Sequence, residues 1–135
     1  MQPEIKFIGT IQSPLKKLED CPRQENEEAP AASVIIYPEF IEGIKDIKAG
    51  TELLLFTWLH QADRTVIQTK PRNDPKAPDT GIFSTRSPDR PNPIGMHQVK
   101  IISIEAGVLK VAALEALDQT PVIDIKPIWK PTPFL

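Results

Sequence analysis

The sequence predicts a mainly β protein: a small single-sheet β-barrel with one or two short helices and a long proline-rich connection. Six segments carry the β-branched, aliphatic and aromatic residues that are typical of strands. The 15 prolines avoid residues 39–70 and 94–120, where the most apolar segments lie. Because proline cannot donate a hydrogen bond to a sheet, this placement separates strands from loops. The 135 residues, 40% of them apolar, suffice for one domain over residues 1–135.

The predicted strands are short and follow one another along the chain. They cover residues 5–12, 32–37, 51–60, 98–105, 108–117 and 121–126. Residues 51–60 are almost wholly apolar, so we expect a central strand that is buried on both faces. Ala106 and Gly107 separate two of the segments, and they predict a hairpin at that point.

One helix is predicted directly after Pro38, a residue that suits the first turn of a helix. Apolar residues recur there at spacings of three and four, at Phe40, Ile41, Ile44 and Ile47. Gly50 is placed to end the helix. Six prolines lie in residues 71–93, which predicts a long, stiffened connection of the kind that is often functional.

Composition and missing motifs exclude several classes of protein. Lys and Arg number 16 against 18 Asp and Glu, so the net charge of −2 gives no global attraction for nucleic acid. A single cysteine, Cys21, excludes an intrachain disulfide and a cysteine-based zinc site, and two histidines make a metal site unexpected. No glycine-rich dinucleotide, Walker or Gly-x-Ser-x-Gly motif is present, which rules out a Rossmann site and a P-loop and disfavours a serine hydrolase. No apolar run suits a signal peptide or membrane span, so we expect a cytoplasmic protein.

The densest run of hydrogen-bonding side chains is residues 81–95, GIFSTRSPDRPNPIG. The planar guanidinium of Arg86 or Arg90 suits a carboxylate or a phosphate, and the prolines limit the entropy that the loop loses on closing over a ligand. Two alternatives remain open. Asp89 or a neighbouring acid holds these arginines in an ion-paired lid, or residues 88–91 act as a PxxP peptide for a partner's aromatic groove.

Three other polar clusters are candidate site segments. His60 begins the run HQADR after the central strand, and it either caps that strand or acts as a general base. Glu115, Asp118 and Asp124 lie at or near a predicted turn, where they pair with the cationic loop, bind a cationic ligand or form only a polar turn. The acid-rich residues 19–28 are expected to be a solvated loop, with a part in the site as the alternative.

Four segments, taken in order, resemble one known family, the TsaA-like domain of the TrmO S-adenosylmethionine-dependent tRNA methyltransferases. They are residues 8–14 (IGTIQSP) with 21–24 (CPRQ), 54–61 (LLFTWLHQ), 81–95 (GIFSTRSPDRPNPIG) and 117–127 (LDQTPVIDIKP). The resemblance covers nearly the whole chain. Residues 81–95 are its most specific part, because they fix three prolines and two arginines in fifteen residues.

The resemblance implies a small β-barrel that binds S-adenosylmethionine without a Rossmann fold, as a homodimer with the cofactor near the subunit interface. It implies methylation of N6 of N6-threonylcarbamoyladenosine, beside the anticodon of tRNA. Carried onto matching positions, the cofactor contacts are Pro22, Arg23, Gln24, His60, Gln61, Arg86, Met96, Leu114, Glu115, Ala116 and Leu117. No metal is required for methyl transfer, which depends mainly on the positioning of the reactants.

Within this resemblance, Arg86 or Arg23 is the hypothetical partner of the methionine carboxylate. Asp118 and His60 are the candidates for the base that takes the acceptor's proton. A local positive patch for RNA phosphates is expected at Lys70, Arg72 and Arg90.

Two departures from the family pattern affect the acceptor. Residues 50–54 read GTELL where members commonly have Phe-Ser-His-Leu-Trp, and the carboxy-terminal extension that handles tRNA in longer members is not found in this sequence. The cofactor is therefore better supported than the tRNA substrate. The alternatives are a methyltransferase with a small-molecule or protein acceptor, and a noncatalytic barrel that binds RNA or a nucleotide.

Overall fold

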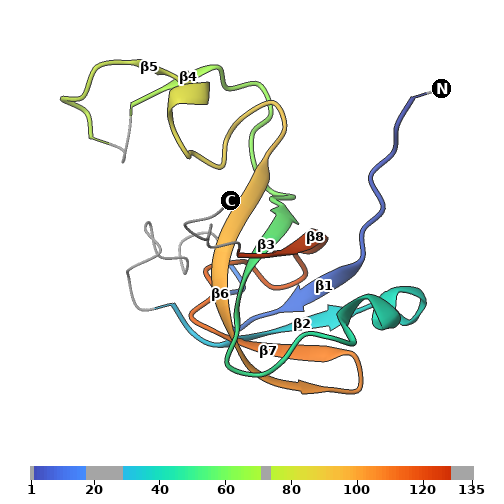
Figure 1. Ribbon diagram of the computed structural model, residues 1–135. Helices are drawn as coiled ribbons and strands as arrows, with labels where there is room; N and C mark the ends of the chain where they lie inside the picture. Colours follow the sequence, from blue (N-terminus) through green and yellow to red (C-terminus); the bar gives the residue numbers. More distant parts are fainter. Residues whose placement is uncertain (1, 18–28, 71–73, 129–135) are drawn as a thin grey trace, which may run out of the picture.

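The computed structural model describes residues 2–17, 29–70 and 74–128. Six antiparallel strands form a closed barrel in the order β1-β2-β7-β6-β3-β8, and β8 pairs with β1 to complete it (Figure 1). These strands are β1 (Gly9–Gln12), β2 (Ala32–Ile36), β3 (Glu52–Trp58), β6 (Ile94–Glu105), β7 (Val108–Ala112) and β8 (Pro121–Pro127). The predicted mainly β, single-sheet barrel is thus confirmed.

β3 pairs with β6 on one side and with β8 on the other. Every strand of the closed barrel has two neighbours, so β3 is not a central strand in the sense predicted. It is not buried on both faces: Leu53, Leu55 and Thr57 point into the barrel, whereas the residues between them are only half-buried. The outer face of β3 is covered only in part, so its apolar side chains pack less tightly than the inner ones. The barrel core is built from inward side chains of all six strands, among them Ile11, Val34, Leu55, Ile101, Leu109, Val111 and Val122.

The predicted helix is present as a 3-10 helix, η2 (Pro38–Ile44), and it ends six residues before Gly50. Its backbone amides bond three residues back, as from Phe40 to the carbonyl of Tyr37. Apolar residues at spacings of three and four suit both an α-helix and a 3-10 helix. In η2, Ile44 is buried, while Phe40 packs only partly against the core.

Several strand boundaries differ from the prediction. β1 begins at Gly9 and not at residue 5, while β6 begins directly after Pro93, before residue 98. β7 ends at Ala112 because Ala113 has a positive φ of 52°, which turns the chain out of the strand. The segment that follows therefore bends across the end of the barrel instead of continuing the sheet to residue 117.

The proline-rich connection contains a small sheet that the sequence did not predict. β4 (Gln68–Thr69) pairs with β5 (Thr80–Gly81), and a short 3-10 helix, η4 (Ile82–Ser84), follows directly. Figure 1 shows this arm standing away from the barrel, beyond the start of β6. No helix in the described residues is long and apolar enough to span a membrane.

Candidate functional site

Antiparallel pairing gathers the predicted site segments at one end of the barrel, which we call the mouth. It comprises the end of β1, the start of β2, the end of β3, the start of β6 and the turns at residues 113–120. The turn before β8 closes this end, because the amides of Asp118 and Gln119 bond to the carbonyls of Leu15 and Ile11. Segments from both halves of the sequence therefore meet at the mouth.

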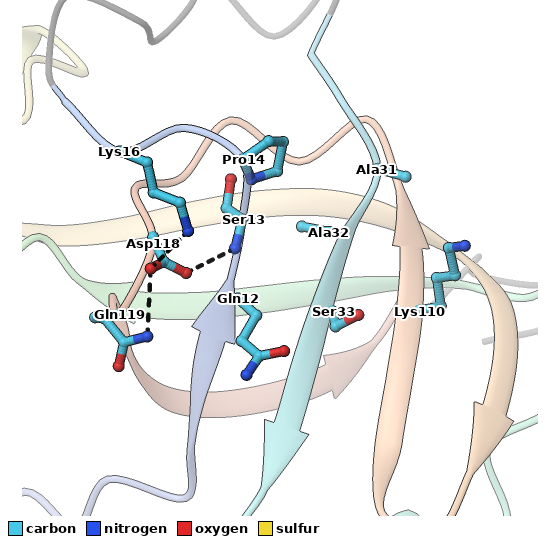
Figure 2. A pocket seen from close by; sticks show the side chains of 10 residues that line it. All are labelled: Gln12, Ser13, Pro14, Lys16, Ala31, Ala32, Ser33, Lys110, Asp118 and Gln119. Carbon is cyan, nitrogen blue, oxygen red and sulfur yellow. Dashed lines mark hydrogen bonds and ion pairs between the residues drawn. The ribbon is translucent and has the colours of Figure 1, made fainter.

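Asp118 is the most heavily bonded acid at the mouth (Figure 2). Its Oδ1 accepts a hydrogen bond from the Ser13 amide at 2.9 Å, and its Oδ2 lies 2.9 Å from Nζ of Lys16 and 3.3 Å from Nε2 of Gln119. The bond from Lys16, followed by the bond from Ser13, lowers the pKa of the Asp118 carboxyl below its ordinary value. Asp118 is therefore a fixed anion at neutral pH and a weaker proton acceptor than an ordinary aspartate.

A hollow of about 380 Å³ lies beside Asp118 (Figure 2). Polar and small side chains line it, namely Gln12, Ser13, Pro14, Lys16, Ala31, Ala32, Ser33, Lys110, Asp118 and Gln119. Among the predicted site residues it contains only Asp118, a candidate base, and none of the predicted cofactor contacts that lie in the described residues.

A second hollow, of about 370 Å³, lies where β7 has ended and β6 is paired only with β3. Its lining includes the predicted contacts Leu114 and Glu115, together with Glu52, His97, Gln98, Val99, Lys100, Ala112 and Ala113. The side chains of Leu114, Ala116 and Leu117 are buried, so this segment offers a ligand mainly its backbone and the Glu115 carboxylate.

His97 was not predicted as a site residue, yet the structure places it inside the mouth. It points inward from β6, is 7% exposed, and its Nε2 lies 2.8 Å from Oγ1 of Thr57 on β3. The pKa of His97 is lowered to about 4, mainly by burial of the imidazole and secondly by the positive charge of Arg86. The sequence signal was the alternation of β6, which puts residue 97 on the same face as the buried Val99 and Ile101.

Arg86 and Arg90 occupy different positions in the loop after η4. Arg86 is exposed and close enough to His97 for its charge to act on the imidazole. Arg90 is half-buried, and its Nη2 donates to the carbonyls of Ile82, at 2.7 Å, and Thr85, at 2.5 Å. Its guanidinium therefore holds the backbone that leads into Arg86. The ion-paired lid alternative expected acids as the partners of the arginines, whereas Arg90 binds carbonyls.

The loop is also tied to the segment after β3. Asp89 Oδ1 accepts a hydrogen bond from the Asp63 amide at 2.8 Å, and Arg64 Nε donates to the carbonyl of Pro91 at 2.7 Å. The Arg64 guanidinium lies 5.0 Å from the ring centre of Trp58, a cation–π distance. These contacts give the Arg86 loop a defined position beside β3.

Other predicted contacts do not line either hollow. His60 and Gln61 are exposed after β3, and Met96 is 44% exposed on the outer face of β6, opposite Phe56. Lys70, on the arm, pairs with Asp79 at 3.2 Å. Pro22, Arg23, Gln24 and Arg72 lie outside the described residues. The part of the chain that the structure describes contains no cluster of three or more side chains suited to a metal ion.

Comparison with known sequences finds close relatives of this barrel. The sequence model of the tRNA-methyltransferase O N-terminal domain matches residues 10–132. A probable S-adenosyl-L-methionine-binding protein of Methanothermobacter thermautotrophicus is 37% identical over 131 residues, covering 96% of this chain and 93% of the relative. A protein of Archaeoglobus fulgidus with the same description is 41% identical over 124 residues, which are 92% of this chain and 33% of the relative.

Solved structures share the architecture. A crystal structure of TrmO from Pseudomonas aeruginosa has a TM-score of 0.73 and 30% identity, and the match covers 96% of this chain and 57% of that one. A second TrmO crystal structure has a TM-score of 0.76 at 30% identity and covers 96% and 58% of the two chains. This chain thus spans little more than half the length of those TrmO chains. From the family match over most of its length and these relatives, the chain belongs to the tRNA-methyltransferase O N-terminal domain family.

Proposed function

We propose that this domain is an S-adenosylmethionine-dependent methyltransferase whose acceptor is N6 of threonylcarbamoyladenosine beside the anticodon of tRNA. The observation that carries the proposal is the family match over residues 10–132. One relative is about as long as this domain and another is about three times longer. The names of both describe S-adenosylmethionine binding. This supports binding by the part that they have in common.

The residues at the mouth fit such a ligand. The hollow of about 370 Å³ lies within the usual range of small-molecule sites, roughly 300–1,000 Å³. It combines the apolar Leu114 with the Glu115 carboxylate, and Arg86 stands close by. A guanidinium suits the methionine carboxylate, and the backbone of residues 114–117 suits the adenosine. The Glu115 carboxylate favours binding of the cationic sulfonium. In contact with the sulfur it would stabilise the ground state more than the transition state, where that charge disappears, so we expect it to lie off the sulfur.

The bound cofactor supplies the methyl group, and the chain's residues orient it and manage the acceptor's proton. Of the two candidate bases, Asp118 is held by Lys16 and Ser13 and has a lowered pKa, so it accepts a proton poorly. His60 is exposed after β3, so its imidazole is open to an acceptor, and histidine is the side chain that most often serves as a general base. His60 is therefore the favoured base, and Asp118 the residue that shapes the turn.

The proposed partners are a second copy of the chain and tRNA. Large apolar side chains stay exposed on the arm and the start of β6, namely Ile67, Phe83, Ile94 and Met96, with Phe83 83% exposed. Exposed apolar side chains of this size are typical of an interface and support a homodimer. A monomer in sedimentation analysis at micromolar concentration would contradict it.

For tRNA, Lys70, Arg72 and Arg90 are the proposed phosphate contacts, although Nη2 of Arg90 already holds the loop.

The first test is titration of the protein with S-adenosylmethionine in a calorimeter. Arg86→Ala should weaken binding at least about tenfold, because a charge-assisted hydrogen bond contributes roughly 1.5–3 kcal/mol. Lys45→Ala, which removes an exposed positive charge at the end of η2, beyond the end of β2 that is opposite to the mouth, is the matched control and should bind as the wild type does. Unchanged affinity in Arg86→Ala would remove that residue from the site.

The acceptor is tested with tRNA that carries or lacks the threonylcarbamoyl group. We expect the mass increase of one methyl group only in the modified tRNA. Binding of S-adenosylmethionine with no methylation of either tRNA would favour another acceptor. Binding of RNA without any affinity for S-adenosylmethionine would instead favour the noncatalytic barrel.

A further inference from the structure

His97 is held rigidly within the mouth of the barrel. Its imidazole Nε2 lies 2.8 Å from Thr57 Oγ1, across the pair of strands β3 and β6. The ring packs over Gly95, where an added Cβ would lie 2.7 Å from His97 Nε2 and 2.5 Å from Thr57 Oγ1. Only glycine leaves room for this arrangement.

The bond to Thr57 determines which ring nitrogen carries the proton. Thr57 is fully buried, and its hydroxyl has no hydrogen-bond partner in the described residues other than His97. A buried hydroxyl hydrogen needs an acceptor, and Nε2 is the one present. Thr57 therefore donates to Nε2, and in the neutral imidazole the proton must then reside on Nδ1. His97 is neutral at physiological pH because its pKa is lowered to about 4.

The Nδ1–H group makes no hydrogen bond within the described residues, in contrast to Nε2, which is bonded to Thr57. His97 also lines the hollow shared with Leu114 and Glu115, and the Arg86 guanidinium is near enough to act on its ring. A neutral donor and a cationic donor thus converge on one region.

We propose that His97 binds the methyl donor directly, with its Nδ1–H donating to the methionine carboxylate beside Arg86. This inference rests on the proposed function. A neutral donor adds a hydrogen bond to the carboxylate without adding positive charge near the sulfonium. Thr57 and Gly95 then act as positioning residues, since they fix the tautomer and the ring.

The test compares two ligands that differ in the amino-acid part: S-adenosylhomocysteine, which has the carboxylate, and 5′-methylthioadenosine, which lacks it. In His97→Gln the amide replaces Nε2 but not Nδ1, and we expect about tenfold weaker binding of S-adenosylhomocysteine with 5′-methylthioadenosine unchanged. In His97→Asn the amide nitrogen takes the place of Nδ1 and should restore most of the affinity. Equal losses for both ligands, or no loss in His97→Gln, would overturn the proposal.

A second measurement does not depend on a variant that folds. The ¹⁵N chemical shifts of His97 in the wild-type protein should show a protonated Nδ1 at pH 7, and S-adenosylhomocysteine should shift the Nδ1–H signal. A proton on Nε2, or no shift in a protein that binds the ligand, would overturn the proposal. If the wild-type protein binds neither ligand, the proposed function fails, and the tautomer assignment is judged separately from the spectrum.

Discussion

At the residue scale, Gly95 is the position where the mouth has no spare room. The Cβ that Gly95→Ala adds must displace Thr57 Oγ1 and His97 Nε2. Overpacking of this kind destabilises a protein by about 1–3 kcal/mol. Gly43→Ala is the matched control, because nothing lies within 4 Å of a Cβ there. It should change stability by less than about 1 kcal/mol. Urea unfolding of both variants checks this, and equal effects at the two positions would contradict the packing described.

His97 also makes a prediction about pH. Between pH 6.5 and 4 the unfolded imidazole takes up a proton that the folded one refuses, so stability falls as pH decreases through this window. The shift from 6.5 to about 4 corresponds to about 3 kcal/mol. The positive charge of Arg86 opposes protonation of the His97 imidazole. Glu115 lines the same hollow as His97.

His97→Gln cannot titrate and should lack this part of the slope. The check is the free energy of unfolding of both proteins at pH 7, 5.5 and 4.5. The carboxylates that the two proteins share contribute the same slope to each, so the difference isolates His97. Parallel curves would mean that the folded imidazole takes up its proton at the same pH as the unfolded one.

At the element scale, the loop of residues 82–92 depends on Arg90. Lysine cannot reproduce a planar guanidinium that reaches two carbonyls, so Arg90→Lys should loosen the loop and weaken S-adenosylmethionine binding through Arg86. Hydrogen exchange should become faster at the amides of Ser87 and Asp89, with the barrel strands unchanged. Unchanged exchange combined with weaker, less salt-dependent RNA binding would instead support the phosphate contact predicted from the sequence.

The elements that could be predicted are those with a strong local pattern. β2, β3 and β8 follow β-branched or apolar runs, and prolines bound several of the segments. β4 and β5 have two residues each, too few for any periodicity to show. The end of β7 depends on the positive φ of Ala113, a residue with no intrinsic preference for that conformation.

The candidate site was predictable only in part, and for a similar reason. The loop around Arg86 stood out because charged residues and prolines crowd into one stretch. His97 did not, since a single histidine in a strand has no distinguishing pattern until the partner strand supplies Thr57. The distinct roles of Arg86 and Arg90 also depend on tertiary contacts, because both are arginines in the same short loop.

At the scale of the whole molecule, the barrel is the constant part of relatives that differ in length. It makes up 93% of one archaeal relative and 33% of another. Cofactor binding is a property that such a shared unit can carry alone, whereas recognition of a particular acceptor can be supplied by whatever surrounds it. The same mouth is therefore compatible with different acceptors in different relatives.

The pairing of β1 with β8 has a consequence for how the protein matures during synthesis. Gly9 and Thr10 cannot complete their pairing until Val122 and Pro121 have left the ribosome, more than a hundred residues later. The turn that carries Asp118 needs both strands, because it bonds to Leu15 and Ile11. A nascent chain can pair β1 with β2 early, but it gains the complete mouth only when the last strand has emerged. Ligand cannot assist the early steps of folding, and it can only stabilise the finished barrel.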